Sequence, residues 1–154
     1  MTSQNKTPAE PQATATIPAK PPQRKWVILL VDDEPEILGS LKRLMTQSLA
    51  GTQILTATSG RAGLEILERE RVDLVMCDFK MPGMDGIEFL VQARRMRPTV
   101  PRIMFTAFAD NDLAHRAVSE AIVSAFFPKS FGPTQMMDQI EALMRYNPDP
   151  SSQQ

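Results

Sequence analysis

Carboxylates follow two short apolar segments of the sequence, and a hydroxyl and an ammonium end two others. "WVILLV" is followed by Asp32 and Asp33, and "DLVMC" is followed by Asp78. Thr106 ends "RIMFT", and Lys129 lies two residues after "SAFF". If these segments are strands of one parallel sheet, the five side chains meet at its carboxyl edge, where ligands bind in such folds.

This set of side chains points to phosphate chemistry. Carboxylates that lie close together repel one another unless a cation sits between them. Oxygen ligands without histidine or cysteine favour Mg²⁺, which commonly works together with a phosphate. A lysine ammonium and a threonine hydroxyl suit phosphate oxygens. The residues therefore predict transfer of a phosphoryl group to a carboxylate, which forms an acyl phosphate.

The elements that must position these residues follow from the hydrophobic pattern. Apolar runs predict strands over residues 26–31, 53–58, 73–77, 102–106 and 124–127. Helical spacing predicts a helix after each, the second beginning at the N-cap Ser59 and the third ending before Pro98. We expect the fourth helix over residues 110–122 and the last to bury a stripe from Met136 to Met144. Such alternation predicts an α/β fold, a doubly wound parallel sheet with helices on both faces.

Composition restricts the class of protein. The chain has 154 residues, of which 42% are hydrophobic, and this suits one domain with its own core. A formal net charge of −1 gives no argument for a direct nucleic-acid partner. The single cysteine, Cys77, excludes an internal disulfide and suits a reducing compartment. With no apolar run of about 18 residues and no signal-peptide core, we expect no membrane insertion and a cytoplasmic location.

The two ends of the chain differ from its middle. Residues 1–25 are rich in proline, threonine, alanine and glutamine, so we expect a disordered arm, with a docking peptide as the alternative. Residues 147–154 are expected to form a flexible tail or the start of a linker, which leaves one domain over 26–146. We expect either a protein that acts through partner contacts or the front end of a longer regulator.

Residues 26–146 resemble the receiver domain of two-component response regulators. The matching segments are "LLVDDEP", "DFKMPGMDG", "FTAFAD" and "FFPKSF", which occur in the order and at the spacing of that family. The resemblance implies a (βα)5 flavodoxin-like sheet with strand order 2-1-3-4-5. It also implies a response regulator that is controlled by phosphorylation and receives its phosphoryl group from a histidine kinase or a histidine phosphotransfer protein.

The resemblance also implies a role for each site residue. Asp78 is the expected phosphoacceptor. Mg²⁺ is expected to bind Asp33, Asp78 and the backbone carbonyl of Lys80 directly, and Asp32 indirectly.

Three further roles follow from the same resemblance. Thr106 and Lys129 are expected to contact the phosphoryl group, and Thr106 is expected to form a conformational switch with Phe126. The family implies a signalling switch rather than an enzyme, although one that assists its own phosphoryl transfer and slow dephosphorylation.

The sequence departs from the family pattern at three positions. Ser130 follows the lysine where the family usually has proline, and Pro128 precedes it. A cis bond before a residue other than proline costs about 3 kcal/mol, so we predict a trans Lys129–Ser130 bond and a reshaped loop. Lys80 and Phe108 are expected to flank the approach of water to the phosphoryl group and to slow its hydrolysis.

Other interpretations remain open at this point. Alone, each site residue could be an ordinary turn, cap or surface residue. A dehalogenase-like phosphatase would need D-x-D after the first strand, where this chain has "DDE". An unphosphorylated scaffold would be favoured by loss of Asp78 or Lys129, and both are present. Flavin binding lacks its Gly-, Ser- and Thr-rich loop.

The fourth helix raises a question about the output surface. Its apolar stripe is broad, so Val118 and Ile122 at the margin predict a surface for an output partner or for self-association, formed with the fifth strand and fifth helix. The alternative is that this helix is buried more deeply. We also expect Cys77 to be a buried strand residue rather than a redox sensor, and His115 to lie on the surface.

Overall fold

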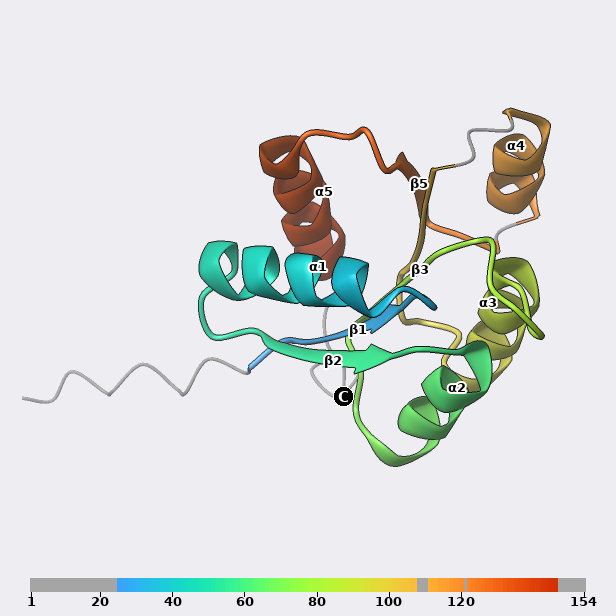
Figure 1. The fold of residues 1–154 in the computed structure, drawn as a ribbon, viewed down its shortest axis with the longest axis horizontal. Coiled ribbons are helices and arrows are strands. Elements are labelled where there is room, and N and C mark those ends of the chain that lie inside the picture. The colour runs from blue at the N-terminus through green and yellow to red at the C-terminus, as the bar shows by residue number, and fades with distance from the viewer. Residues whose placement is uncertain (1–24, 108–110, 121, 147–154) are drawn as a thin grey trace, which may run out of the picture.

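The computed structural model describes residues 25–107, 111–120 and 122–146. Five parallel strands form one sheet in the order β2-β1-β3-β4-β5, as predicted. Helices α1 and α5 cover one face and α2, α3 and α4 the other (Figure 1). The elements are β1 Val27–Val31, α1 Pro35–Ser48, β2 Gln53–Ala57, α2 Gly60–Arg69, β3 Leu74–Cys77, α3 Gly86–Met96, β4 Arg102–Thr106, α4 Asn111–Ser119, β5 Ala125–Pro128 and α5 Pro133–Tyr146.

Several predictions concern residues outside the described part of the chain. The arm, apart from Lys25, and the tail over 147–154 lie there, as does Phe108. Within the described residues, no helix combines the length and apolarity needed to cross a membrane.

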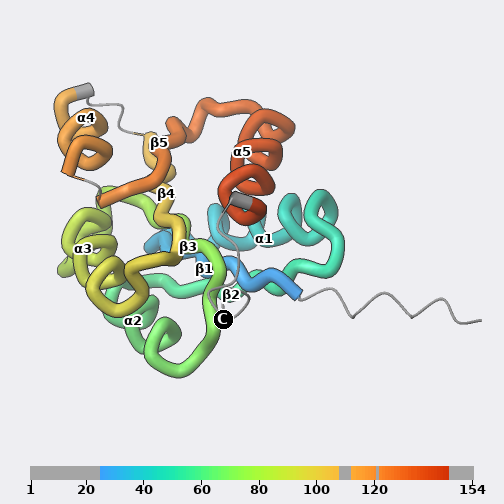
Figure 2. Tube along the Cα trace, turned by 180° about the vertical axis from the view of Figure 1, so that it is seen from behind, coloured from blue at the N-terminus to red at the C-terminus, as the bar shows by residue number. Residues whose placement is uncertain are grey.

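Strands β1 and β3 are apolar and buried along their whole length because they lie inside the sheet and helices cover both of its faces. In β1, Leu29 and Val31 belong to the core cluster beneath α2, α3 and α4. Their neighbours Ile28 and Leu30 belong to the second cluster, which packs with α1 and α5. Figure 2 shows the strands between these two layers of helices. Because all five strands are parallel, their carboxyl ends lie together at one edge of the sheet.

Short polar contacts begin two of the helices. The Ser59 hydroxyl accepts the Ala62 N–H at 3.1 Å, which confirms the predicted N-cap of α2. The Asp85 carboxylate accepts the Glu88 N–H at 2.9 Å and begins α3. Gly63 lowers the helix propensity of α2, but a Cβ there would lie 2.8 Å from the Phe89 ring. Because Gly63 has no Cβ, α2 can pack closely on α3.

The fourth helix is shorter than predicted, and one of its residues was misassigned. The prediction placed a helix over 110–122, whereas α4 ends at Ser119. The Arg94 guanidinium donates to the Glu120 carbonyl at 2.8 Å, and the Arg102 guanidinium donates to the Ile122 carbonyl at 2.7 Å. Ile122 is only 6% exposed and belongs to the core, so its assignment to a partner surface was wrong.

Candidate functional site

The ends of β1 and β3 bring two carboxylates to the same edge of the sheet. The Asp78 N–H donates to the Val31 carbonyl at 2.9 Å, which continues the pairing of the two strands beyond their last residues. The Asp32 carboxylate accepts the Glu34 N–H at 2.9 Å, and the Asp78 carboxylate accepts the Phe79 N–H at 2.8 Å. Local backbone amides therefore orient both acids.

Asp32, Asp33 and Asp78 form an acidic cluster. Each offers one carboxylate oxygen, and these oxygens all lie within 4.8 Å of one another. Asp32 is 2% exposed and Asp78 is 6% exposed, while Asp33 is more open to solvent. Burial raises the pKa of Asp32, and the charge of Asp78 adds to this rise, although the Glu34 amide and Lys129 oppose it. The negative charges of these carboxylates are therefore unfavourable in the cluster. A bound cation would offset this repulsion.

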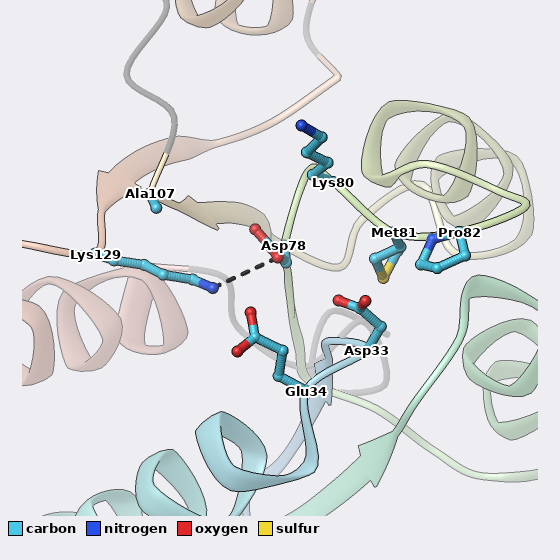
Figure 3. Close-up of a pocket in the computed structure, with 8 residues that line it drawn as sticks. All are labelled: Asp33, Glu34, Asp78, Lys80, Met81, Pro82, Ala107 and Lys129. Atoms are coloured by element: carbon cyan, nitrogen blue, oxygen red, sulfur yellow. Dashed lines mark hydrogen bonds and ion pairs between the residues drawn. The ribbon is translucent and has the colours of Figure 1, made fainter.

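The Lys129 ammonium lies against this cluster. Its Nζ is 3.3 Å from Asp32 Oδ2 and 3.5 Å from Asp78 Oδ2, and Figure 3 shows the contact with Asp78. It also lies 5.9 Å from the centroid of the Phe105 ring. Burial acts to lower the pKa of Lys129, but the attraction of the two carboxylates outweighs it and the pKa is raised. The amine is therefore a cation at neutral pH.

An open pocket of about 460 Å³ gives access to these groups. Its lining residues are Asp33, Glu34, Asp78, Lys80, Met81, Pro82, Ala107 and Lys129 (Figure 3). Glu34 was not among the predicted site residues, yet its carboxylate extends into the same space as those of Asp33 and Asp78 (Figure 3). The signal in the sequence is its position directly after the acidic pair Asp32 and Asp33.

Thr106 and Phe126, the two residues of the predicted switch, lie on the same side of the sheet. Thr106 is fully buried at the end of β4. Phe126 on β5 is opposite Met104, two residues before Thr106, and packs half-buried against the core cluster on the α4 side. Two positions along a strand return to the same face, so both side chains point toward the α4 layer.

Two single residues are placed as expected. Cys77 is 1% exposed, and burial raises the pKa of its thiol well above the usual value, with the charge of Asp78 adding to the effect. A buried, protonated thiol is unreactive, which agrees with a strand residue rather than a redox sensor. His115 lies exposed on α4.

The loop after β5 has the predicted peptide geometry. The Lys129–Ser130 bond is trans, and the described residues contain no cis peptide bond. The Phe131 N–H donates to the Pro128 carbonyl at 2.9 Å and closes a turn across these two residues. Lys129 enters the turn with its own N–H bonded to the Thr106 carbonyl at 2.9 Å.

Comparison with known proteins identifies the family. The model of the response regulator receiver domain matches residues 28–141. The chain belongs to the response regulator receiver family. This receiver has the strand order and helix arrangement of that family, and a receiver is a signalling switch within a two-component system.

Curated relatives of this receiver are longer regulators. It is 37% identical to the transcriptional regulatory protein GlrR of Escherichia coli over 63% of this chain and 21% of that protein. It is 31% identical to the alkaline phosphatase synthesis regulator PhoP of Bacillus subtilis over 77% of this chain and 48% of that protein. The chain therefore spans less than half of the length of each of these two regulators.

Solved structures match the receiver over nearly their whole length. A receiver domain from Clostridium thermocellum has a TM-score of 0.72 at 28% identity and covers 79% of this chain and 95% of that one. The response regulator TrrA of Thermotoga maritima, solved in complex with Mg²⁺ and a beryllium fluoride, has a TM-score of 0.68 at 29% identity. That match covers 77% of this chain and 98% of TrrA.

Proposed function

We propose that this receiver is switched by phosphorylation of Asp78, with a histidine kinase or a histidine phosphotransfer protein as donor. One observation carries the proposal. The Asp78 carboxylate borders an open pocket, and the Lys129 ammonium lies 3.5 Å from one of its oxygens. A nucleophilic carboxylate and a cation for the incoming phosphoryl oxygens are thus already together. A cytoplasmic location, where such kinases present phosphohistidine, belongs to the same proposal.

The chemical step uses groups that the pocket presents. A carboxylate oxygen of Asp78 attacks the phosphorus of phosphohistidine, the P–N bond breaks, and the imidazole nitrogen keeps the electron pair and takes up a proton. The product is an acyl phosphate on Asp78. As negative charge develops on the phosphoryl oxygens, the Lys129 ammonium donates a hydrogen bond to them. The Thr106 hydroxyl is the second donor to these oxygens.

The acidic cluster fits Mg²⁺. Its ligands would be Asp33, Asp78 and the backbone carbonyl of Lys80, with Asp32 bound indirectly; Asp33, Asp78 and Lys80 are residues that line the pocket. All are hard oxygen ligands, which this cation prefers, and the site leaves room for water. When bound, Mg²⁺ supplies positive charge that offsets repulsion between the acids and the phosphoryl oxygens.

The consequence of phosphorylation is a movement of Thr106 and Phe126. The phosphoryl group adds up to about two negative charges and new acceptor oxygens beside β4. Thr106 moves toward it, and the half-buried Phe126 turns inward into the space that is vacated. This movement reshapes the adjoining surface of α4, β5 and α5, which is the proposed contact for an output partner or for self-association.

Val118 marks this output surface. It is 51% exposed, and among the residues that the structure describes no other large hydrophobic residue is exposed. Val118→Glu should therefore fold and accept phosphate normally but lose association that depends on phosphorylation, as measured by light scattering or partner titration. Normal association of the folded variant would place the output surface elsewhere.

The alternative role within a longer regulator is favoured by the comparisons. The curated relatives carry additional chain beyond the matched receiver region. Sequencing the full transcript and measuring the mass of the protein made in its native cell would distinguish a receiver that works alone from one joined to an output domain. The receiver chemistry is the same in both cases.

Intact-protein mass spectrometry tests the proposed function. With Mg²⁺ and acetyl phosphate, the wild-type protein should gain one phosphoryl group, and chelation of Mg²⁺ should prevent the gain. Asp78→Asn should remain unmodified, while Asp85→Asn, at a helix cap in the next loop, should be modified as wild type. Full modification of Asp78→Asn would overturn the assignment.

A further inference from the structure

The turn that carries Lys129 is fixed at both ends. At its start, the Lys129 N–H bonds to the Thr106 carbonyl at 2.9 Å, which attaches the turn to β4. At its end, the Phe131 N–H bonds to the Pro128 carbonyl at 2.9 Å. Between these bonds lies Ser130, which is exposed and has a trans peptide bond before it. Nothing in Ser130 itself restricts the backbone as a proline ring would.

The aromatic ring of Phe131 supplies the missing restriction. It stacks on the ring of Phe127 with centroids 5.1 Å apart and an angle of 3° between the planes. Phe127 is only 4% exposed and is held in the core cluster on the α1 and α5 side. The residues on either side of Phe131, Ser130 and Gly132, are exposed. The stack therefore joins the outgoing end of the turn to a rigid part of the core.

The same core cluster also lies beside the Lys129 side chain. Phe105, whose ring lies 5.9 Å from Lys129 Nζ, belongs to the core cluster that contains Phe127, and Phe131 packs against that cluster. The lysine must reach across from the turn to carboxylates at the ends of β1 and β3. A shift of about 1 Å in the turn would separate the ammonium from both carboxylates, and displacements of this size cost up to about a hundredfold in rate.

We infer that Phe131 is a positioning residue: its stack on Phe127 holds the turn so that the Lys129 ammonium reaches Asp32 and Asp78. The inference about ammonium placement stands on the contacts above. Its consequence for phosphoryl transfer rests on the proposed function of Asp78. Two measurements separate these parts, one that needs no phosphorylation and one that does.

The first measurement follows the reactivity of the Lys129 amine. Limited acetylation with acetic anhydride, followed by peptide mass spectrometry, gives the labelling rate of Lys129 relative to the exposed Lys42. In Phe131→Ala the relative rate should rise by about tenfold, because the Lys129 side chain, only 18% exposed beside its carboxylates, becomes open to the reagent when the turn is released. Phe131→Tyr, which keeps a ring for stacking, should restore the wild-type rate.

The matched control is Leu143→Ala. Leu143 is also partly buried and packs against the same core cluster, but it lies near the far end of α5. This variant loses similar apolar packing and should leave the relative labelling of Lys129 unchanged. If Phe131→Ala does not fold, Phe131→Leu, which keeps apolar contact without a ring, replaces it. Unchanged Lys129 labelling in a folded Phe131 variant, or an equal rise in Leu143→Ala, overturns the inference.

The second measurement is a double-mutant cycle on the rate of phosphorylation by acetyl phosphate. Phe131→Ala should slow the wild-type protein about tenfold but should add nothing when Lys129 is already methionine. Equal slowing in both backgrounds would show that Phe131 does not act through Lys129. If the wild-type protein accepts no phosphate, the proposed function fails, and the labelling experiment still decides the placement of Lys129.

Discussion

The backbone of Gly86, the first residue of α3, lies directly against the backbone carbonyl of Asp78. A Cβ built on Gly86 would collide with that oxygen and would lie 2.8 Å from the Cα of Phe79. The Gly86 N–H also donates to the Phe79 carbonyl at 2.7 Å. The start of α3 is therefore packed onto the segment that carries the proposed phosphoacceptor, and only glycine fits between them.

Gly86→Ala should destabilise the fold and disturb the site together. The added methyl group meets backbone that cannot move without displacing Asp78, so we expect a loss of about 1–3 kcal/mol in the free energy of unfolding and slower phosphorylation. Urea denaturation gives the stability. The control is Gly39→Ala on α1, where a Cβ meets nothing within 4 Å, and this change should stabilise by about 1 kcal/mol. Equal stability of the two variants would disprove the close-packing argument.

Asp33→Ala should abolish tight Mg²⁺ binding while the fold survives. Loss of a direct carboxylate ligand is expected to weaken binding at least about tenfold, as measured by isothermal titration calorimetry. The metal-free variant should be at least as stable as wild type, because one member of a repulsive cluster is gone. Glu36→Ala removes an equal charge from the first turn of α1 and should bind Mg²⁺ normally. Unaltered binding in Asp33→Ala would exclude Asp33 as a ligand.

Cys77 should make stability fall at alkaline pH. The native state keeps the thiol proton because the pKa is raised, whereas the unfolded chain releases it above the ordinary value of 9.0. The unfolded state therefore binds fewer protons, and stability decreases by about 1.4 kcal/mol per pH unit above that value. Denaturation between pH 8 and 10 should show a shallower decrease for Cys77→Ala. Parallel curves for the two proteins would contradict a buried, protonated thiol.

The switch should depend on the hydroxyl of Thr106. In the wild-type protein, phosphorylation should change the NMR signals of the Phe126 ring, because the ring moves inward when Thr106 moves. Thr106→Ala should accept phosphate but leave the Phe126 signals near their unphosphorylated positions. Thr56→Ala, at an exposed position of the edge strand β2, serves as the control and should respond as wild type. A full Phe126 response in Thr106→Ala would remove Thr106 from the pathway.

The fold and most of the site could be predicted because they depend on patterns local to each segment. Apolar runs predict strands that are covered on both faces, and Asp32, Asp78 and Thr106 are found where their strands end. Parallel pairing then brings the strand ends together without further information. Ser59 is likewise a local signal, because an N-cap depends on the residues of its own turn.

The features that could not be predicted depend on partners far away in the sequence. Gly63 and Gly86 look unfavourable by helix propensity, and only the approach of Phe89 and Asp78 explains them. Ile122 fitted a continued helix, but Arg94 and Arg102 from other elements bond to the carbonyls beyond α4. These tertiary contacts end the helix earlier than the hydrophobic periodicity of the sequence predicts.

The central claim is that Asp78 carries the phosphoryl group, and trapping of the acyl phosphate tests it most directly. Borohydride reduces an aspartyl phosphate to homoserine and leaves free carboxylates intact. After phosphorylation with Mg²⁺, reduction and peptide sequencing by mass spectrometry, homoserine should be found at position 78 and at no other aspartate. Homoserine at position 32 or 33, or none in a phosphorylated protein, would contradict the account.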